Sequence, residues 1–380
     1  MQEWTSDFSA GNAEKVHLRN DGTVVFSIES EPGGPEYLWF NLKVAAKSDA
    51  PIWFMVENAL NAHQTNERWS ISRPFFSTDG KNWIRCIDSR FGKEGIAKQG
   101  GDPVFRFRSP IVADTLYTAY FQPFTLSDLE TYLQAISTRE NVSVSVLGQS
   151  EEGRDIPMVM LPSIGASEDT QTIWIVTREH PGEAPASFVC QGMIEALLSD
   201  EYKSLRQKFS FKIVPILNVD GVEAGYYYHN AKGVNLARDW VDFEAVETRA
   251  LKSALEQDTT GPGIPFVVNL HSSNDPSKGH FFLKIPSRNL SVEDAERQKA
   301  FYKYAGRQHD QIQGNAPVIL KDIPGIMGNV LYEKYGIYVL YFESNYSRGA
   351  DGSDVTVESL LEVGEALVNA VALVTLGEPQ

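Results

Sequence analysis

Four consecutive residues, His180-Pro181-Gly182-Glu183, place an imidazole and a carboxylate close together in the sequence. They follow an apolar segment at residues 172–176, which predicts a strand, and precede an amphipathic segment, which predicts a helix. In a turn between a strand and a helix, side chains three residues apart can face the same ion. A His-x-x-Glu pattern arises readily by chance, so its weight depends on further ligands. Zinc is the first hypothesis that these residues support.

His271 and Glu343 also follow apolar segments, at residues 266–270 and 337–342. Because neighbouring strands of an open α/β sheet end at one edge, His271 can supply the third ligand of the same zinc. A zinc ion with three protein ligands keeps a water whose pKa falls to about 7, and hydrolysis then needs a carboxylate to move the proton. Glu343 is the candidate for that general base and acid. Taken singly, His271 is more simply a structural histidine and Glu343 a surface carboxylate; together with His180 and Glu183 they favour a metal site.

The elements that must position these side chains alternate after Pro123. Continuous apolar strands between amphipathic helices indicate a sheet that is covered on both faces. We therefore predict an α/β/α mixed-sheet domain over residues 125–380 that holds every chemical candidate. The predicted strands are 143–147, 156–161, 172–176, 209–216, 266–270 and 337–342, and the predicted helices are 126–136, 184–198, 243–255, 292–309, 325–335 and 355–376.

The first 124 residues have a different pattern, with short and often alternating apolar segments between turn residues. No long helical period interrupts them. An antiparallel β-sandwich fits best, so the chain is predicted to have two domains, 1–124 and 125–380. The strands expected in the sandwich are 24–28, 37–44, 52–56, 104–107 and 115–121.

The composition excludes several classes of function. The chain has 380 residues and a net charge of −16 at pH 7, which argues against proteins that bind nucleic acid or anionic membranes through a basic surface. Cys86 and Cys190 are far apart and suggest no disulfide framework. The first residues lack the pattern of a secretory signal, and no apolar run approaches the roughly 18 residues of a membrane span. These features favour a cytoplasmic protein.

Five ordered motifs resemble those of the zinc metallocarboxypeptidases, and a chance match of all five is improbable. The N-terminal region narrows the resemblance to the cytosolic carboxypeptidase branch, in which a β-sandwich precedes the catalytic domain. The five motifs are His180-Pro-Gly-Glu183, Asn218-x-Asp220-Gly221, Gly233-x-Asn235-Leu236-x-Arg238-x-Trp240, His271 and Phe342-Glu343. The N-terminal resemblance is carried by Arg73-Pro-Phe-Phe-Ser77, Asn82-Trp83-x-Arg85 and Tyr117-x-Ala-Tyr-Phe-x-Pro-Phe-Thr125.

The resemblance implies an enzyme that removes the C-terminal residue of a peptide or protein, including acidic residues. His180, Glu183 and His271 would bind one zinc ion per chain, and Glu343 would act as general base and then general acid. Arg238 would hold the terminal carboxylate of the substrate, because a guanidinium offers two parallel donors.

Two residues depart from the family pattern. Ala237 stands where the family usually has an asparagine, so one donor to the substrate carboxylate is missing. Tyr228 stands where the branch carries an arginine that stabilises the oxyanion, and losing such a donor costs about 3–4 kcal/mol. Three accounts remain open: Tyr228 or His229 donates instead, the substrate lacks a free main-chain carboxylate, or the zinc site is retained with little peptidase activity. The alternatives to a carboxypeptidase are a zinc amidase that acts on an acylated amino acid or a cell-wall-type peptide, and a zinc-binding protein that has lost peptidase activity.

The tyrosine that covers the substrate in this family has no clear counterpart. Residues 321–325 occupy the corresponding loop without a tyrosine. Tyr332 and Tyr335 are expected to be packing residues, and Tyr346 is a weaker candidate for a residue that faces the site.

Overall fold

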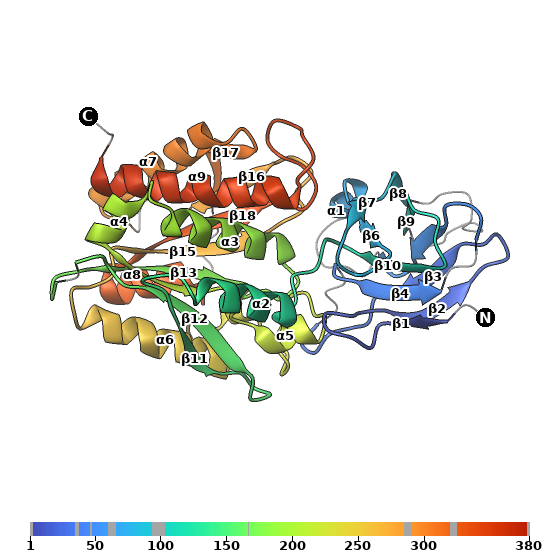
Figure 1. Ribbon diagram of the computed structural model, residues 1–380, viewed down its shortest axis with the longest axis horizontal. Coiled ribbons are helices and arrows are strands. Elements are labelled where there is room, and N and C mark those ends of the chain that lie inside the picture. The colour runs from blue at the N-terminus through green and yellow to red at the C-terminus, as the bar shows by residue number, and fades with distance from the viewer. Residues whose placement is uncertain are drawn as a thin grey trace.

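The computed structural model describes residues 3–34, 38–45, 48–59, 66–92, 103–165, 167–284, 290–319 and 325–377. Figure 1 shows two parts side by side, a β-sandwich built from the N-terminal residues and a larger α/β part that contains the C-terminus. The predicted combination of a β-sandwich and a mixed-sheet α/β domain is confirmed. The change between them falls between β10 and α2, and the division at residue 124 stays a prediction.

Two five-stranded sheets form the sandwich, and phenylalanine rings from both sheets fill the space between them. The rings of Phe40 and Phe107 stack at 5.5 Å between centroids, and Phe54 packs edge-on against Phe76 at 5.2 Å. Strand pairs are antiparallel except for β3 and β5, which run parallel. The strand order of the first sheet is β1 (Trp4–Thr5), β4 (Asn41–Ala45), β10 (Thr115–Ala119), β6 (Phe75–Ser77) and β7 (Ile84–Arg85). The order of the second is β2 (Glu14–Leu18), β3 (Val24–Ser27), β5 (Trp53–Val56), β9 (Val104–Arg108) and β8 (Asp88–Gly92). The short helix α1 is Asn66–Ser70.

An eight-stranded mixed sheet is the centre of the α/β part. Its four central strands, β14, β13, β15 and β18, run parallel and carry mainly buried apolar side chains. The strand order is β11 (Ser143–Gln149), β12 (Asp155–Leu161), β14 (Ser210–Val214), β13 (Thr172–Thr177), β15 (Phe266–Ser272), β18 (Tyr338–Ser344), β16 (His280–Lys284) and β17 (Ile312–Ile319).

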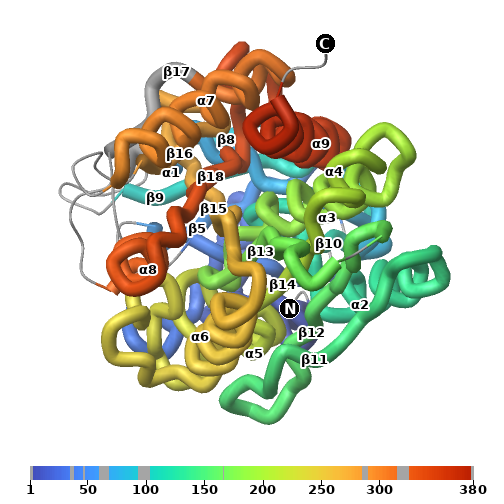
Figure 2. Tube along the Cα trace, turned by 90° about the vertical axis from the view of Figure 1, so that its left-hand side faces the viewer, coloured from blue at the N-terminus to red at the C-terminus, as the bar shows by residue number. Residues whose placement is uncertain are grey.

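Helices cover both faces of this sheet, as the sequence predicted. In Figure 1, α3, α4, α7 and α9 lie on one side, and α6 and α8 lie on the other; Figure 2 shows the same layers from the end. The helices of the α/β part are α2 (Leu126–Ile136), α3 (Ala184–Leu198), α4 (Lys203–Lys208), α5 (Val219–Glu223), the 3-10 turn η2 (Leu236–Arg238), α6 (Val246–Thr259), α7 (Val292–Gln308), α8 (Met327–Tyr335) and α9 (Val357–Leu376).

The last helix, α9, corrects the expectation that no apolar segment approaches the length of a membrane span. By length and composition α9 could cross a membrane, although it contains Glu362 and Glu365. Its apolar side packs on α3, where Gly192 and Gly364 let the two backbones approach closely. A Cβ on Gly192 would lie 2.2 Å from the carbonyl oxygen of Leu361. The apolar length of α9 therefore serves a helix pair that covers the sheet.

The sandwich contacts the α/β part along the segment that follows α5. The Asn12 side-chain amide donates to the carbonyl oxygen of Gly225 at 2.9 Å, and the Ala10 N–H donates to the carbonyl oxygen of Glu223 at 2.9 Å. Gly33 and Gly233 touch backbone to backbone, because a Cβ on Gly33 would lie 2.3 Å from the Gly233 carbonyl oxygen. Residues 223–233 are thus held by both parts of the chain.

Candidate metal centre and active site

Three central strands bring the candidate residues to one edge of the sheet. Strand β13 runs parallel to β15, and β15 runs parallel to β18, so their carboxyl ends lie together. His271 and Glu343 are directly paired across β15 and β18, and both lie inside their strands, slightly earlier than a strand-end position. His180 and Glu183 lie on the turn that follows β13.

A buried arginine shapes that turn. Arg178 adopts a left-handed backbone conformation with φ of 59°, and its guanidinium donates to the carbonyl oxygen of Pro181 and to the Ser187 hydroxyl. Gly182 is required by close approach, since a Cβ there would lie 2.4 Å from the Tyr227 ring. The turn is therefore fixed before any ligand binds, which favours precise placement of His180 and Glu183.

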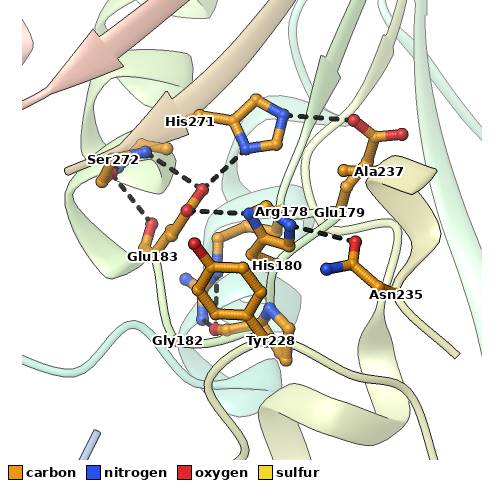
Figure 3. Close-up of polar contacts among 12 residues, drawn as sticks. Arg178, Glu179, His180, Gly182, Glu183, Tyr228, Asn235, Ala237, His271 and Ser272 are labelled. Carbon is orange, nitrogen blue, oxygen red and sulfur yellow. Dashed lines mark hydrogen bonds and ion pairs between the residues drawn. The ribbon is translucent and has the colours of Figure 1, made fainter. Parts of the chain in front are cut away.

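His180, Glu183 and His271 form a compact buried group, shown in Figure 3. The Nδ1 atoms of His180 and His271 lie 2.9 and 2.8 Å from the two carboxylate oxygens of Glu183. The possible ligand atoms of the three residues all lie within 4.8 Å of one another. Two imidazole nitrogens and a carboxylate oxygen are the ligand set of many catalytic zinc sites.

The outer partners of the two histidines test whether a cation fits. The Nε2 atom of His180 is 3.2 Å from the side-chain amide oxygen Oδ1 of Asn235, and Nε2 of His271 is 3.1 Å from the Glu179 carboxylate (Figure 3). Both partners only accept, so each Nε2 carries the hydrogen and each Nδ1 presents a lone pair to Glu183. A carboxylate and two imidazole nitrogens that converge in a buried site need a positive charge between them, which either a proton or a metal ion can supply. The site therefore fits a divalent metal, with the outer partners that metal-binding histidines usually have.

The pKa values follow from this concentration of charge. Burial acts to raise the pKa of Glu183, but the two neighbouring imidazoles outweigh it and lower the pKa. Burial likewise acts to lower the pKa of His271, and the carboxylates of Glu183 and Glu179 raise it well above its usual value. Burial and the Glu183 charge raise the pKa of Glu343 to about 7, against His271, Arg68 and Arg238, which lower it.

A cavity of about 160 Å³ opens onto the metal centre. Glu343, Arg238 and Tyr228 line it, so the structure brings these predicted residues to one place with the histidines. The Tyr228 ring stacks on His180 at 4.2 Å between centroids. Ala237 also lines the cavity, and its methyl group offers no hydrogen-bond donor, as the sequence predicted. The lining residues are Arg68, His180, Glu183, Tyr228, Ala237, Arg238, His271, Ser272, Ser273, Leu283, Ile326, Tyr341 and Glu343.

His229, the other candidate for substrate binding, lies elsewhere. Its Nδ1 is 2.8 Å from the carboxylate of Glu31, which belongs to the sandwich, and His229 is outside the lining of the cavity. This contact uses the imidazole to join the two parts of the chain. The structure gives Tyr228, not His229, access to the site.

The three tyrosines weighed as covers for the substrate also lie outside the cavity. Tyr346 is buried and donates to the carbonyl oxygen of Gly182 at 3.1 Å, while the Tyr332 and Tyr335 hydroxyls contact Asp294 and Glu256. Residues 321–324 of the corresponding loop lie outside the described residues.

Sequence reasoning missed four residues of the site. Glu179 and Asn235 stand beside or inside recognised motifs, but only the fold shows that they contact the histidines. Tyr341 is two residues before Glu343 on the same strand, and this spacing puts both side chains on one face. Arg68 comes from the sandwich, far ahead of the first metal motif in the sequence, and nothing in the local sequence marks it.

Comparisons with known proteins agree with this geometry. Residues 129–275 match the zinc carboxypeptidase family, and residues 4–121 match the cytosolic carboxypeptidase N-terminal domain. A mouse relative, cytosolic carboxypeptidase 6, is 27% identical over 319 residues, covering 76% of this chain and 55% of the relative. An uncharacterised protein of Zymomonas mobilis is 27% identical over 307 residues, covering 79% of this chain and 74% of the relative. The chain thus spans little more than half of the mouse protein.

Solved structures share the whole fold. A metallo-carboxypeptidase from Pseudomonas aeruginosa superposes with a TM-score of 0.86 and 19% identity, covering 99% of both chains. A carboxypeptidase from Shewanella denitrificans superposes with a TM-score of 0.85 and 24% identity, covering 98% of both chains. On the two matched regions, this chain belongs to the zinc carboxypeptidase family, in the branch that carries the cytosolic carboxypeptidase N-terminal domain.

Proposed function

We propose that this protein is a zinc-dependent carboxypeptidase that removes the C-terminal residue of a peptide or protein. The observation that carries the proposal is the convergence of His180, Glu183 and His271 in one cavity, with Glu343 paired directly opposite His271. These three side chains would hold one zinc ion per chain. The names of the relatives favour the cytoplasm as its location.

Zinc bound at this site would act as a Lewis acid that lowers the pKa of a water molecule and polarises a carbonyl group. Glu343 takes a proton from that water as the water oxygen bonds to the carbonyl carbon. The same carboxyl group then gives the proton to the amide nitrogen as the carbon–nitrogen bond breaks. The products are the released residue and a peptide that is one residue shorter.

Arg238 would bind the terminal carboxylate of the substrate. Its guanidinium lies at the same cavity as Glu343 and donates one hydrogen bond to the Ala237 carbonyl oxygen at 3.0 Å, which orients the fork. The remaining donors suit the two oxygens of a carboxylate. Two arginines, Arg68 and Arg238, are among the described lining residues, and this local positive charge in an acidic protein suits a substrate that carries negative charge. A preference for acidic terminal residues is part of the proposal.

One experiment tests the proposal at its centre. Purified wild type and E343Q are assayed for bound zinc and for amino acids released from peptides ending in Glu, Asp, Lys or Phe. We expect both proteins to hold zinc, and only the wild type to release the terminal residue, with Glu released fastest. Zinc binding without release from any peptide would contradict the carboxypeptidase activity.

Ala237 and Tyr228 support a second candidate, because neither provides a cation or an amide donor for a substrate carboxylate. A zinc amidase whose substrate lacks a free main-chain carboxylate would not need these donors. Such an enzyme would cleave a C-terminally amidated peptide as fast as the peptides with free carboxylates. A zinc-binding protein without catalysis would cleave none of them.

A further inference from the structure

The N-terminal sandwich sends one side chain into the catalytic cavity. Arg68, on the short helix α1, lines the same cavity as His180, Glu183 and Glu343, although the other lining residues belong to the α/β part. Among the residues that the structure describes, the sandwich contributes no second side chain to that lining. Its role in this chain therefore includes a direct contribution to the site.

The backbone of Arg68 is fixed at the junction of the two parts. Its carbonyl oxygen accepts from the side-chain amide of Asn274 at 3.0 Å and from the Ser72 hydroxyl at 2.9 Å. Asn274 follows His271 by three residues and also donates to the Tyr120 hydroxyl at 2.9 Å. The same junction that holds Arg68 is thus tied to the strand that carries His271, so the guanidinium is placed relative to the metal centre.

Arg68 and Arg238 both act on Glu343, but the other groups with which they interact differ. Burial acts to lower the pKa of Arg68, and Tyr227, Tyr228, Tyr120 and Glu343 raise it to a net value above the usual one. Arg238 instead bears on Tyr341 and Glu343. Both arginines line the cavity with Glu343, and the Tyr228 ring, on which Arg68 acts, stacks on His180 at 4.2 Å between centroids.

The division between two cations matches the needs of amide hydrolysis. The terminal carboxylate needs a cation some distance from the reacting carbonyl, and Arg238 provides it. The carbonyl oxygen becomes negatively charged in the transition state and needs a donor beside the metal, where the α/β part offers the neutral Tyr228. Arg68 lines the cavity together with Tyr228 and Glu343 and interacts electrostatically with both.

We propose that Arg68 donates hydrogen bonds to the oxyanion that forms on the scissile carbonyl, so that the sandwich completes the active site of the α/β part. The inference rests on the proposed carboxypeptidase function. In this proposal the sandwich supplies a catalytic residue that the α/β part lacks. The α/β part alone would then hold zinc and yet hydrolyse peptides slowly.

Two other roles for Arg68 give different results. A purely structural arginine would change stability and leave the rate constants of the folded enzyme unchanged. An arginine that binds the acidic side chain of the substrate would matter for peptides ending in Glu and not for those ending in Phe. The oxyanion role lowers kcat for both.

The test compares wild type, R68Q and R68K with R73Q as the matched control. Arg73 also lies in the sandwich and reaches the α/β part, through an exposed ion pair with Asp354 at 2.6 Å, but it is outside the cavity lining. For R68Q we expect kcat to fall by about 10²–10³-fold on peptides ending in Glu and in Phe, with KM changed little. R68K should recover part of the loss, because it restores the charge but not the fork. R73Q should match the wild type.

Two measurements do not depend on turnover. Zinc content should be the same in all four proteins. A peptide in which a tetrahedral phosphinate replaces the scissile amide should bind R68Q more weakly by the same factor as the loss in kcat/KM, while the shortened product peptide should bind equally well. Thermal unfolding of each variant checks that the comparison is made on folded protein.

The possible results separate the two proposals. An active wild type with an equally active R68Q, or a loss confined to peptides ending in Glu, would overturn the oxyanion role and leave the carboxypeptidase function standing. Equal weakening of the phosphinate and the product peptide would also overturn it. A wild type that neither cleaves peptides nor binds the phosphinate would overturn the carboxypeptidase function, and the role of Arg68 with it.

Discussion

The carboxylate of Glu31, in the sandwich, accepts a hydrogen bond from the backbone N–H of Tyr228, beside the catalytic cavity, at 3.0 Å. The same carboxylate accepts from the Tyr227 N–H and contacts Nδ1 of His229. One buried side chain of the sandwich therefore anchors three consecutive residues of the α/β part. Since Tyr228 stacks on His180, this anchor reaches the metal centre through a single aromatic contact.

Replacing Glu31 should loosen this anchor. In E31Q one oxygen becomes an NH₂ group, which cannot accept from the backbone N–H groups, and a buried donor is left without its partner. We expect the free energy of unfolding to fall by about 2–4 kcal/mol, as measured by urea denaturation. The control is E29Q, at an exposed position two residues earlier. Equal losses of unfolding free energy in E29Q and E31Q would show that the buried contacts of Glu31 do not stabilise the protein.

Glu179 should tune metal affinity without binding the metal. It accepts from His271, from Asn269 at 2.7 Å and from the Trp240 indole at 3.0 Å, and these bonds hold the His271 ring in place. For E179Q we expect zinc affinity to fall by about 10–100-fold, measured by competition with a chelator. E201Q, an exposed change, should bind zinc as the wild type does. Unchanged zinc affinity in E179Q would show that Glu179 does not support metal binding.

Arg238 should act on substrate binding. A charge-assisted pair of hydrogen bonds to the terminal carboxylate contributes about 1.5–3 kcal/mol, so KM should rise by about 10–100-fold in R238Q. The amidated form of the same peptide, which lacks the carboxylate, should be hydrolysed equally poorly by wild type and R238Q. R139Q, which removes an exposed arginine paired with Glu195, is the control. A KM that does not change in R238Q would favour the amidase alternative.

His280 should make stability depend on pH. It is fully buried; its Nδ1 accepts from the Asn345 N–H at 2.9 Å, and its Nε2 donates to Gln311 at 3.2 Å, so the neutral ring satisfies both partners. Burial is the main reason that its pKa falls to about 4 from the ordinary 6.5. Below pH 6.5 the unfolded chain therefore takes up a proton that the folded chain refuses. The stability present above pH 6.5 is lost as the pH falls towards 4, by up to about 3 kcal/mol.

Urea unfolding at several pH values between 7 and 4.5 measures this loss. We expect H280Q to lose less stability than the wild type over that range, because the variant has no imidazole to protonate at this position. H17Q, on strand β2 of the sandwich, is the control and should follow the wild-type slope. Parallel curves for wild type and H280Q would show that His280 does not set the acid sensitivity.

The local sequence determined much of this protein. The pattern of apolar residues was sufficient to predict α2 and α3 at their observed bounds, and the Thr125 side chain caps α2. The strands that carry the metal motifs were also predictable, because buried parallel strands are apolar along their whole length. Polar residues at the ends of such strands stand out for the same reason. Hence the amino-acid sequence alone is sufficient to name His180, Glu183, His271 and Glu343 as candidates.

Only the tertiary structure decided the rest, because the deciding contacts join residues that are far apart in the sequence. The pairing of His271 with Glu343 depends on β15 and β18 being neighbours, although the intervening strands β16 and β17 separate them in the sequence and were not foreseen. The parallel pairing of β3 with β5 likewise depends on the closed sandwich. Arg68, Glu31 and Asn274 gain their importance from the docking of one part of the chain on the other, which leaves no local pattern. Periodicity reports which face of an element is buried, and docking decides which partner buries it.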